Sequence, residues 1–104
     1  MIHMVPLSLE AEKRIDLLFP EDQREQVRIL LRDECGDNLP LLPKRRDPAY
    51  YDRYRFAALK LGNGDLSRLQ DAIRLAKTDS RDLLVGAGFA NDTTIHLSWL
   101  PDRK

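Results

Sequence analysis

The chain has 104 residues, of which 42% are hydrophobic, and its 17 basic side chains balance 17 acidic ones. This length predicts a single domain over residues 1–104 that buries enough surface to fold without disulfides or a metal. Zero net charge argues against a protein that binds nucleic acid over its whole surface, and the apolar content argues against an intrinsically disordered chain.

Leucine dominates the apolar residues, with 18 leucines against five isoleucines and three valines. Leucine keeps its rotamer freedom in a helix, whereas β-branched side chains lose it against the preceding turn. We therefore expect an all-α fold, a single compact domain of five or six short helices around a central αα-hairpin.

Two helices are predicted in the first third of the chain, after an N-terminal arm formed by residues 1–7. Ser8 offers an N-cap for the first helix, which has to end near Phe19 because a proline follows. Pro20 suits the first position of the second helix, and Gly36 is placed for a left-handed C-terminal cap.

Residues 36–47 form the longest stretch without a helical pattern. Pro40 and Pro43 forbid a regular helix and favour extended backbone before each proline. The stretch is too apolar for a flexible linker, so we expect an ordered loop that lies against the core. Its leucines are Leu39, Leu41 and Leu42.

The central hairpin is predicted from the next two helices. Asp47, followed by a proline, begins the third helix in the favoured order. Tyr50 and Tyr54 start an apolar face that continues along this helix and predicts a central position for it. The Gly-Asn-Gly turn at 62–64 and a cap at Asp65 then begin the fourth helix, which completes an αα-hairpin.

The end of the chain fits two different structures. Residues 79–82 are predicted to break the chain and cap a fifth helix that ends at Gly88. Residues 92–100 then fit a sixth helix, which we favour because a capping residue lies directly upstream. Apolar residues also alternate over 94–99, as in a half-buried strand that would pair with residues 2–5 in an α+β fold.

Location is predicted from what the chain lacks. No apolar run approaches the roughly 18 residues of a membrane span. The early acids Glu10, Glu12 and Asp16 do not fit a signal peptide, and the single cysteine cannot form an internal disulfide. We therefore expect a cytoplasmic protein that does not associate with membranes.

No catalytic or metal-binding pattern is found in the sequence. The two histidines, His3 and His96, lie at opposite ends, and Cys35 has no cysteine partner at the spacing of a zinc site. Cys35 also ends a predicted helix among acids, where the pKa of a thiol rises, so we expect it to be buried and inert. We expect a protein that needs no metal or cofactor and is not an enzyme.

One segment, 44–55, combines five cations and three tyrosines with only two acids. Tyrosine and arginine are enriched at binding hot spots, so this segment predicts an interaction or regulatory module that binds a protein partner, or a second copy as a homodimer. Tyr51 is the predicted anchor, and the arginines would pair with an acidic patch. The predicted contact residues are Arg45, Arg46, Tyr51, Arg53 and Arg55.

Two other interpretations of these regions stay open. Segment 44–55 also fits a solvated face whose arginines pair with aspartates while its other tyrosines, Tyr50 and Tyr54, face the core. Nucleic-acid binding is the alternative function, through segment 44–55 or through residues 82–100, which resemble a degenerate helix-turn-helix. The second helix of that unit would present Thr93, Thr94, His96 and Ser98 to base edges.

Overall fold

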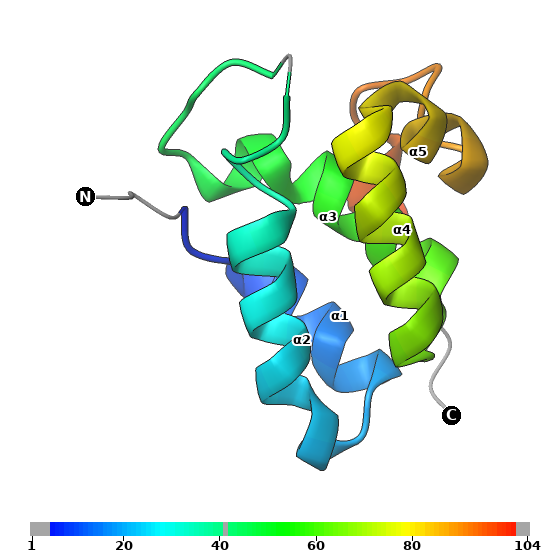
Figure 1. The fold of residues 1–104 in the computed structure, drawn as a ribbon. Helices are drawn as coiled ribbons and strands as arrows, with labels where there is room; N and C mark the ends of the chain where they lie inside the picture. Colours follow the sequence, from blue (N-terminus) through cyan, green and yellow to red (C-terminus); the bar gives the residue numbers. More distant parts are fainter. Residues whose placement is uncertain (1–4, 41, 102–104) are drawn as a thin grey trace.

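The computed structural model describes residues 5–40 and 42–101, which form five α-helices and one short 3-10 helix, η1 (Figure 1). The elements are α1 (Leu9–Leu18), α2 (Glu21–Glu34), α3 (Pro48–Gly62), α4 (Leu66–Thr78), α5 (Ser80–Ala87) and η1 (Ile95–Ser98). No strand occurs in these two ranges, which confirms the prediction of an all-α fold.

Short polar side chains begin four of the five α-helices, as predicted. Ser8 accepts a hydrogen bond from the third residue of α1, and the carboxylates of Asp47, Asp65 and Asp79 cap α3, α4 and α5 in the same manner. Pro20, predicted at the first position of the second helix, is instead the N-cap residue, so α2 begins one residue later than predicted. The capping oxygens satisfy N–H groups that have no partner inside the helix.

The end of α2 differs from the prediction. Cys35 is the C-cap residue, and Gly36 does not adopt a left-handed conformation. Space, rather than backbone conformation, requires a glycine here, because a Cβ on Gly36 would lie 2.7 Å from Nη2 of Arg55. The prediction of a left-handed cap at Gly36 is therefore wrong, and the glycine makes room for a buried guanidinium group.

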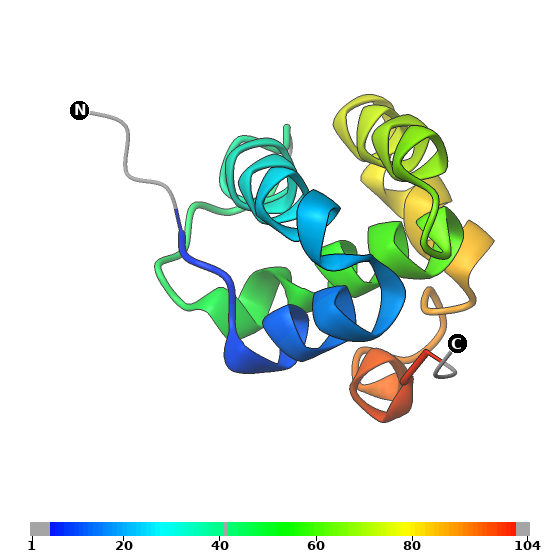
Figure 2. The same ribbon diagram turned by 90° about the horizontal axis from the view of Figure 1, so that it is seen from below.

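α3 is the central helix of the fold. It packs against α1, α4, α5 and η1, and in Figure 2 it crosses the middle of the molecule with α2 and α4 above it and η1 below. Asn63 (φ 50°) and Gly64 (φ 84°) form the left-handed turn that brings α4 back onto α3. The prediction that these two helices form the centre of the fold is confirmed.

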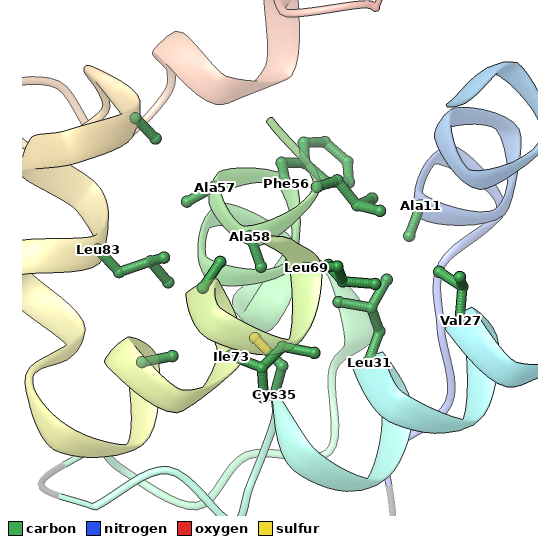
Figure 3. Packing of buried hydrophobic residues seen from close by; sticks show 14 of the residues in the cluster. Ala11, Val27, Leu31, Cys35, Phe56, Ala57, Ala58, Leu69, Ile73 and Leu83 are labelled. Atoms are coloured by element: carbon green, nitrogen blue, oxygen red, sulfur yellow. The ribbon is translucent and has the colours of Figure 1, made fainter. Parts of the chain in front are cut away.

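Side chains of all the α-helices meet in one hydrophobic core around α3 (Figure 3). Small residues at Ala57 and Ala58 occupy the face of α3 between α4 and α5, where bulkier side chains would hold the helices apart. The loop at 36–47 also contributes, as predicted, because Leu39 and Leu42 pack against this core. Leu41 lies outside the described residues.

The N-terminal half of α3 buries a different face from the one predicted. Tyr51, Asp52 and Arg55 are almost completely buried, whereas Tyr50 and Tyr54 remain partly exposed. The interpretation of this segment as a solvated face is wrong for Arg55, which is buried, whereas its expectation that Tyr54 faces the core is confirmed, because this side chain packs against the core. Hydrogen bonds within the protein compensate for the burial of these polar groups.

Residues 92–100 form neither the predicted α-helix nor a strand. η1 is a 3-10 turn closed by backbone hydrogen bonds, and it is too short to be a sixth α-helix. The backbone oxygens of Leu97 and Trp99 accept hydrogen bonds from Arg14 of α1, at 3.3 and 3.0 Å, instead of from a neighbouring strand.

The partner expected for that strand was the N-terminal arm at residues 2–5. Residues 2–4 lie outside the described residues. The Val5 side chain is buried, and its backbone oxygen accepts a hydrogen bond from Arg55 at 2.8 Å. The described end of the arm is thus bound to a side chain of α3 and not to residues 94–99.

Close packing between α3 and α4 predicts opposite effects for two glycine substitutions. Gly62→Ala should lower the free energy of unfolding by about 1–3 kcal/mol, because the new Cβ would lie 3.0 Å from Cα of Leu69. Gly86→Ala is the matched control, since its nearest neighbour is Leu61 Cδ1 at 3.5 Å. It should raise stability by about 0.5–1 kcal/mol through helix propensity.

Urea unfolding followed by circular dichroism measures both substitutions. If Gly62→Ala stabilised the protein as much as Gly86→Ala, the close contact between α3 and α4 would be contradicted.

Candidate binding groove

Two of the five predicted contact residues are buried. Tyr51 and Arg55 have no exposed surface, so neither side chain can touch a partner at the surface of the protein. The prediction that Tyr51 anchors a partner is therefore wrong, and so is the prediction that Arg55 pairs with an external acid. Both side chains bind the backbone of this protein instead.

Tyr51 stabilises the loop that precedes α3 through hydrogen bonds to its backbone. Its hydroxyl accepts a hydrogen bond from the backbone N–H of Arg45 at 2.9 Å and donates one to the backbone oxygen of Pro43 at 3.1 Å. The loop therefore has a fixed geometry where its cations reach the surface, and Tyr51 acts as a support for that surface.

Arg55 joins three segments of backbone. Its Nε donates to the oxygen of Cys35 at 3.0 Å, its Nη1 to Pro6 at 2.9 Å and its Nη2 to Val5 at 2.8 Å. Burial lowers the pKa of this guanidinium from its usual value. Arginine nevertheless stays charged in proteins, so the three carbonyl oxygens solvate a permanent buried cation.

The other three predicted residues, Arg45, Arg46 and Arg53, are partly or fully exposed. The Arg45 guanidinium lies over the ring of Tyr50, 5.0 Å from its centroid. Tyr50 precedes Tyr54 by one turn of α3, so the two rings share one side of the helix. Arg45 of the loop and Tyr50 and Tyr54 of α3 therefore form a row of cationic and aromatic side chains.

Arg53 shapes the loop that follows α5. Its Nη2 donates to the backbone oxygens of Phe89 at 2.8 Å and Ala90 at 3.1 Å, and its Nε donates to Phe89 at 3.3 Å. Gly88 reverses the chain before these residues with a φ of 80°. In the described part of the chain, Nη1 of Arg53 makes no hydrogen bond, which leaves one edge of the guanidinium for a ligand.

A groove of about 310 Å³ lies between α3, α5 and this loop, and we call it the basic groove. Its polar lining residues are Arg53, Tyr54, Ser80, Arg81 and Asn91, and its apolar lining residues are Leu84, Val85 and Ala90.

Most polar side chains of the basic groove are open to a ligand. Over residues 5–40 and 42–101, no hydrogen bond or ion pair engages the side chains of Tyr54, Ser80, Arg81 or Asn91, and none of their atoms is buried without a partner. Burial raises the pKa of Tyr54, so its hydroxyl is a neutral donor. The groove thus presents O–H and N–H donors beside the exposed apolar side chain of Val85.

Acidic residues border the basic groove. Asp79 and Asp82 lie at the start of α5, and Asp92 follows the loop. Hydrogen bonds from Thr94 hold the pKa of Asp92 below its usual value, and the nearby Arg53 lowers it further. These acids are sequence neighbours of the lining residues Ser80, Arg81 and Asn91.

The helix-turn-helix predicted over residues 82–100 is not formed. α5 is followed by a loop and the four-residue η1, so no second α-helix is present to enter a DNA groove. His96, which was expected to face base edges, is buried with its ring 5.6 Å from that of Phe56. The prediction that residues 82–100 form this unit is therefore wrong.

Neither His96 nor Cys35 belongs to the basic groove. Burial raises the pKa of the Cys35 thiol to about 12, and its predicted burial is confirmed. Burial, with Arg53 and Arg14 nearby, lowers the pKa of His96, whose Nδ1 has no hydrogen-bond partner among the described residues. His3 lies outside the described residues, among which no three His, Cys, Asp or Glu side chains could share a metal ion.

Of the lining residues only Arg53 was a predicted contact residue, and the sequence analysis missed the others, Tyr54, Ser80, Arg81, Leu84, Val85, Ala90 and Asn91. The local signal is weak: Arg81 and Val85 place a cation and an exposed apolar side chain one turn apart on α5. Their approach to Arg53 depends on how α5 packs against α3, which no local pattern shows.

Comparisons with protein-family models, with curated proteins and with solved structures find no match to this chain. Within residues 5–40 and 42–101, none of the helices is long and apolar enough to cross a membrane.

Proposed function

We propose that this protein is a non-enzymatic interaction module that binds a short acidic segment of a protein partner in the basic groove. The observation that carries the proposal is the pairing of two arginines, Arg53 and Arg81, with an apolar wall in one open groove. Arginine offers parallel N–H donors that match a carboxylate, and a neighbouring apolar side chain of the partner would cover Val85.

The surroundings of the groove favour a protein ligand over nucleic acid. A phosphate backbone carries a charge at every nucleotide and gains most from an uninterrupted row of cations. Here Asp79, Asp82 and Asp92 interrupt the cations, and the whole chain has no net charge. A peptide can place one or two carboxylates against the arginines and leave the bordering acids without a close neighbour.

The basic segment is connected to this groove along α3, because Tyr50 lies one turn before the lining residue Tyr54. Arg45, stacked on Tyr50, and the exposed Arg46 would extend the contact to acids that flank the bound segment. The proposal keeps Arg45, Arg46 and Arg53 from the original prediction. We also propose a cytoplasmic location, which the unpaired and buried thiol of Cys35 supports.

Fluorescence anisotropy tests the proposal with a labelled peptide in which Glu-Leu pairs are separated by Gly and Ser. We expect a dissociation constant on the order of 100 μM at low salt, as for a small and exposed site. Arg81→Glu should weaken binding about tenfold, since it removes one cation and adds a repulsive charge. Arg68→Glu is the matched control, because Arg68 is an exposed arginine on α4 outside the groove.

Three probes separate the possible ligands. The peptide with lysine in place of glutamate should not bind. A single-stranded RNA or a DNA duplex that bound more tightly than the acidic peptide would favour nucleic-acid binding instead. Equal loss of peptide binding in Arg81→Glu and Arg68→Glu would show that overall charge, and not the basic groove, attracts the peptide.

A further inference from the structure

The outer face of α2 has the chemistry that the basic groove would recognise. Asp22, Glu25, Gln26 and Ile29 recur every three or four residues and are all exposed, so they share one side of the helix. The nearest cation to Glu25 in the described structure is Arg28, at 3.5 Å, and the Glu25 side chain stays 77% exposed. We call this surface the acidic face of α2.

The acidic face and the basic groove have matching spacings. Glu25 and Ile29 place an acid and an apolar side chain one turn apart on α2. Arg81 and Val85 place a cation and an apolar side chain one turn apart on α5. Two helices laid side by side in the same direction would therefore pair the charges and cover both apolar side chains together.

These two surfaces cannot meet within one molecule. α2 and α5 lie on opposite sides of the fold in both views (Figures 1 and 2). Charge is also divided along the chain: residues 8–34 hold eight acids and five bases, whereas the rest holds nine acids and twelve bases. One copy can thus present an acidic end to the basic end of another.

We infer that the acidic face of α2 from a second copy of this chain is a ligand of the basic groove. The inference depends on the proposed function, because it names one partner for the same groove. The contact is heterologous: each copy uses its groove on one side and its acidic face on the other, so association can continue beyond a dimer. Exposed ion pairs contribute little each, and salt screens them, so the association is weak and salt-sensitive.

Sedimentation velocity over a range of protein concentrations tests the inference. The weight-average sedimentation coefficient of the wild-type protein should rise with concentration at low salt and stay near the monomer value at high salt. Glu25→Arg and Arg81→Glu should each reduce the association constant about tenfold. Asp71→Lys, which changes an exposed acid of α4 outside both surfaces, should leave it unchanged.

Two further samples distinguish a direct contact from a general effect of charge. The double variant Glu25→Arg/Arg81→Glu exchanges the two charges and should recover self-association. A mixture of the two single variants should also associate, with the two variants alternating, because each groove then meets an acidic or charge-reversed face of opposite charge on the other variant.

Separate outcomes overturn the inference and the proposed function. A wild-type protein that stays monomeric at low salt while the acidic peptide still binds would overturn the inference alone. Self-association that persists in both single variants would also overturn it, because a different surface would be responsible. Absence of peptide binding would overturn the proposed function as well.

Discussion

Replacing Arg55 with alanine is expected to lower the free energy of unfolding by about 3–5 kcal/mol, because up to three backbone carbonyls would lose their donor at about 1–3 kcal/mol for each that stays buried. The substitution leaves a cavity beside Gly36 and removes the donor for the backbone oxygens of Val5, Pro6 and Cys35. A buried carbonyl without a partner loses its bond to water and gains nothing in return. Small domains are stable by only about 5–15 kcal/mol, so a large part of the stability would be lost.

Urea unfolding followed by circular dichroism measures this effect, with Arg68→Ala as the control at an exposed arginine. Arg55→Lys should recover little, because a single ammonium group cannot reach three carbonyl oxygens in a fixed fork. Gly36→Ala should cost less in the Arg55→Ala background than in the wild type, since the clash at 2.7 Å with Nη2 is then absent. An Arg55→Ala effect below about 1 kcal/mol would contradict the role assigned to this network.

The parts of the fold that were predicted correctly depend on chemistry within a few residues. Ser8, Asp47, Asp65 and Asp79 cap helices because their side-chain oxygens reach amides two or three positions ahead. Such local preferences fix where the helices begin, and the leucine-rich composition fixes the fold class.

The parts that were predicted wrongly depend on contacts between distant segments. Arg55 is buried because the carbonyls of residues 5, 6 and 35 converge on it, and no pattern near residue 55 shows that they do. Tyr51 is buried for a similar reason, through the backbone of the loop before α3. The usual preferences of arginine and tyrosine predict exposed side chains at Tyr51 and Arg55, whereas tertiary hydrogen bonds bury both.

In the basic groove, too, one residue was predicted from local sequence and the others depend on contacts between distant segments. Arg53 was a predicted contact residue and does line the groove, but its partner Arg81 comes from another helix. The alternation of apolar residues over 94–99 likewise indicated a strand, although two of their carbonyl oxygens are bound by Arg14 from α1. The periodicity of apolar residues cannot show that a distant side chain, and not a neighbouring strand, binds these backbone oxygens.

Replacing Arg14 with alanine is expected to release the C-terminal segment from α1, because Arg14 holds this segment by hydrogen bonds. Arg14 is 1% exposed, and its guanidinium lies 4.0 Å from the centroid of the Phe56 ring. It also binds the backbone oxygens of Leu97 and Trp99. We expect the free energy of unfolding to fall by about 2–4 kcal/mol through the lost bonds and the lost stacking on Phe56.

Trp99 is the single tryptophan of the chain, so its fluorescence reports directly on this segment. Its indole lies near Phe56 and Phe89, with ring centroids 6.4 and 6.3 Å away. In Arg14→Ala, the emission should shift to longer wavelength under native conditions as the ring meets water. Glu10→Gln is the matched control, because it weakens the ion pair with Arg14 and keeps every backbone contact of the guanidinium.

Comparing the Trp99 emission of Arg14→Ala and Glu10→Gln separates the effect of the ion pair from the effect of the hydrogen bonds to the backbone. The Glu10 side chain is 60% exposed, so water screens its attraction to Arg14, and Glu10→Gln should leave the Trp99 emission unchanged. An unshifted spectrum in Arg14→Ala would mean that aromatic packing alone holds the segment against α3. A shift of equal size in both variants would mean that the ion pair, and not the bonds to Leu97 and Trp99, sets the position of Arg14.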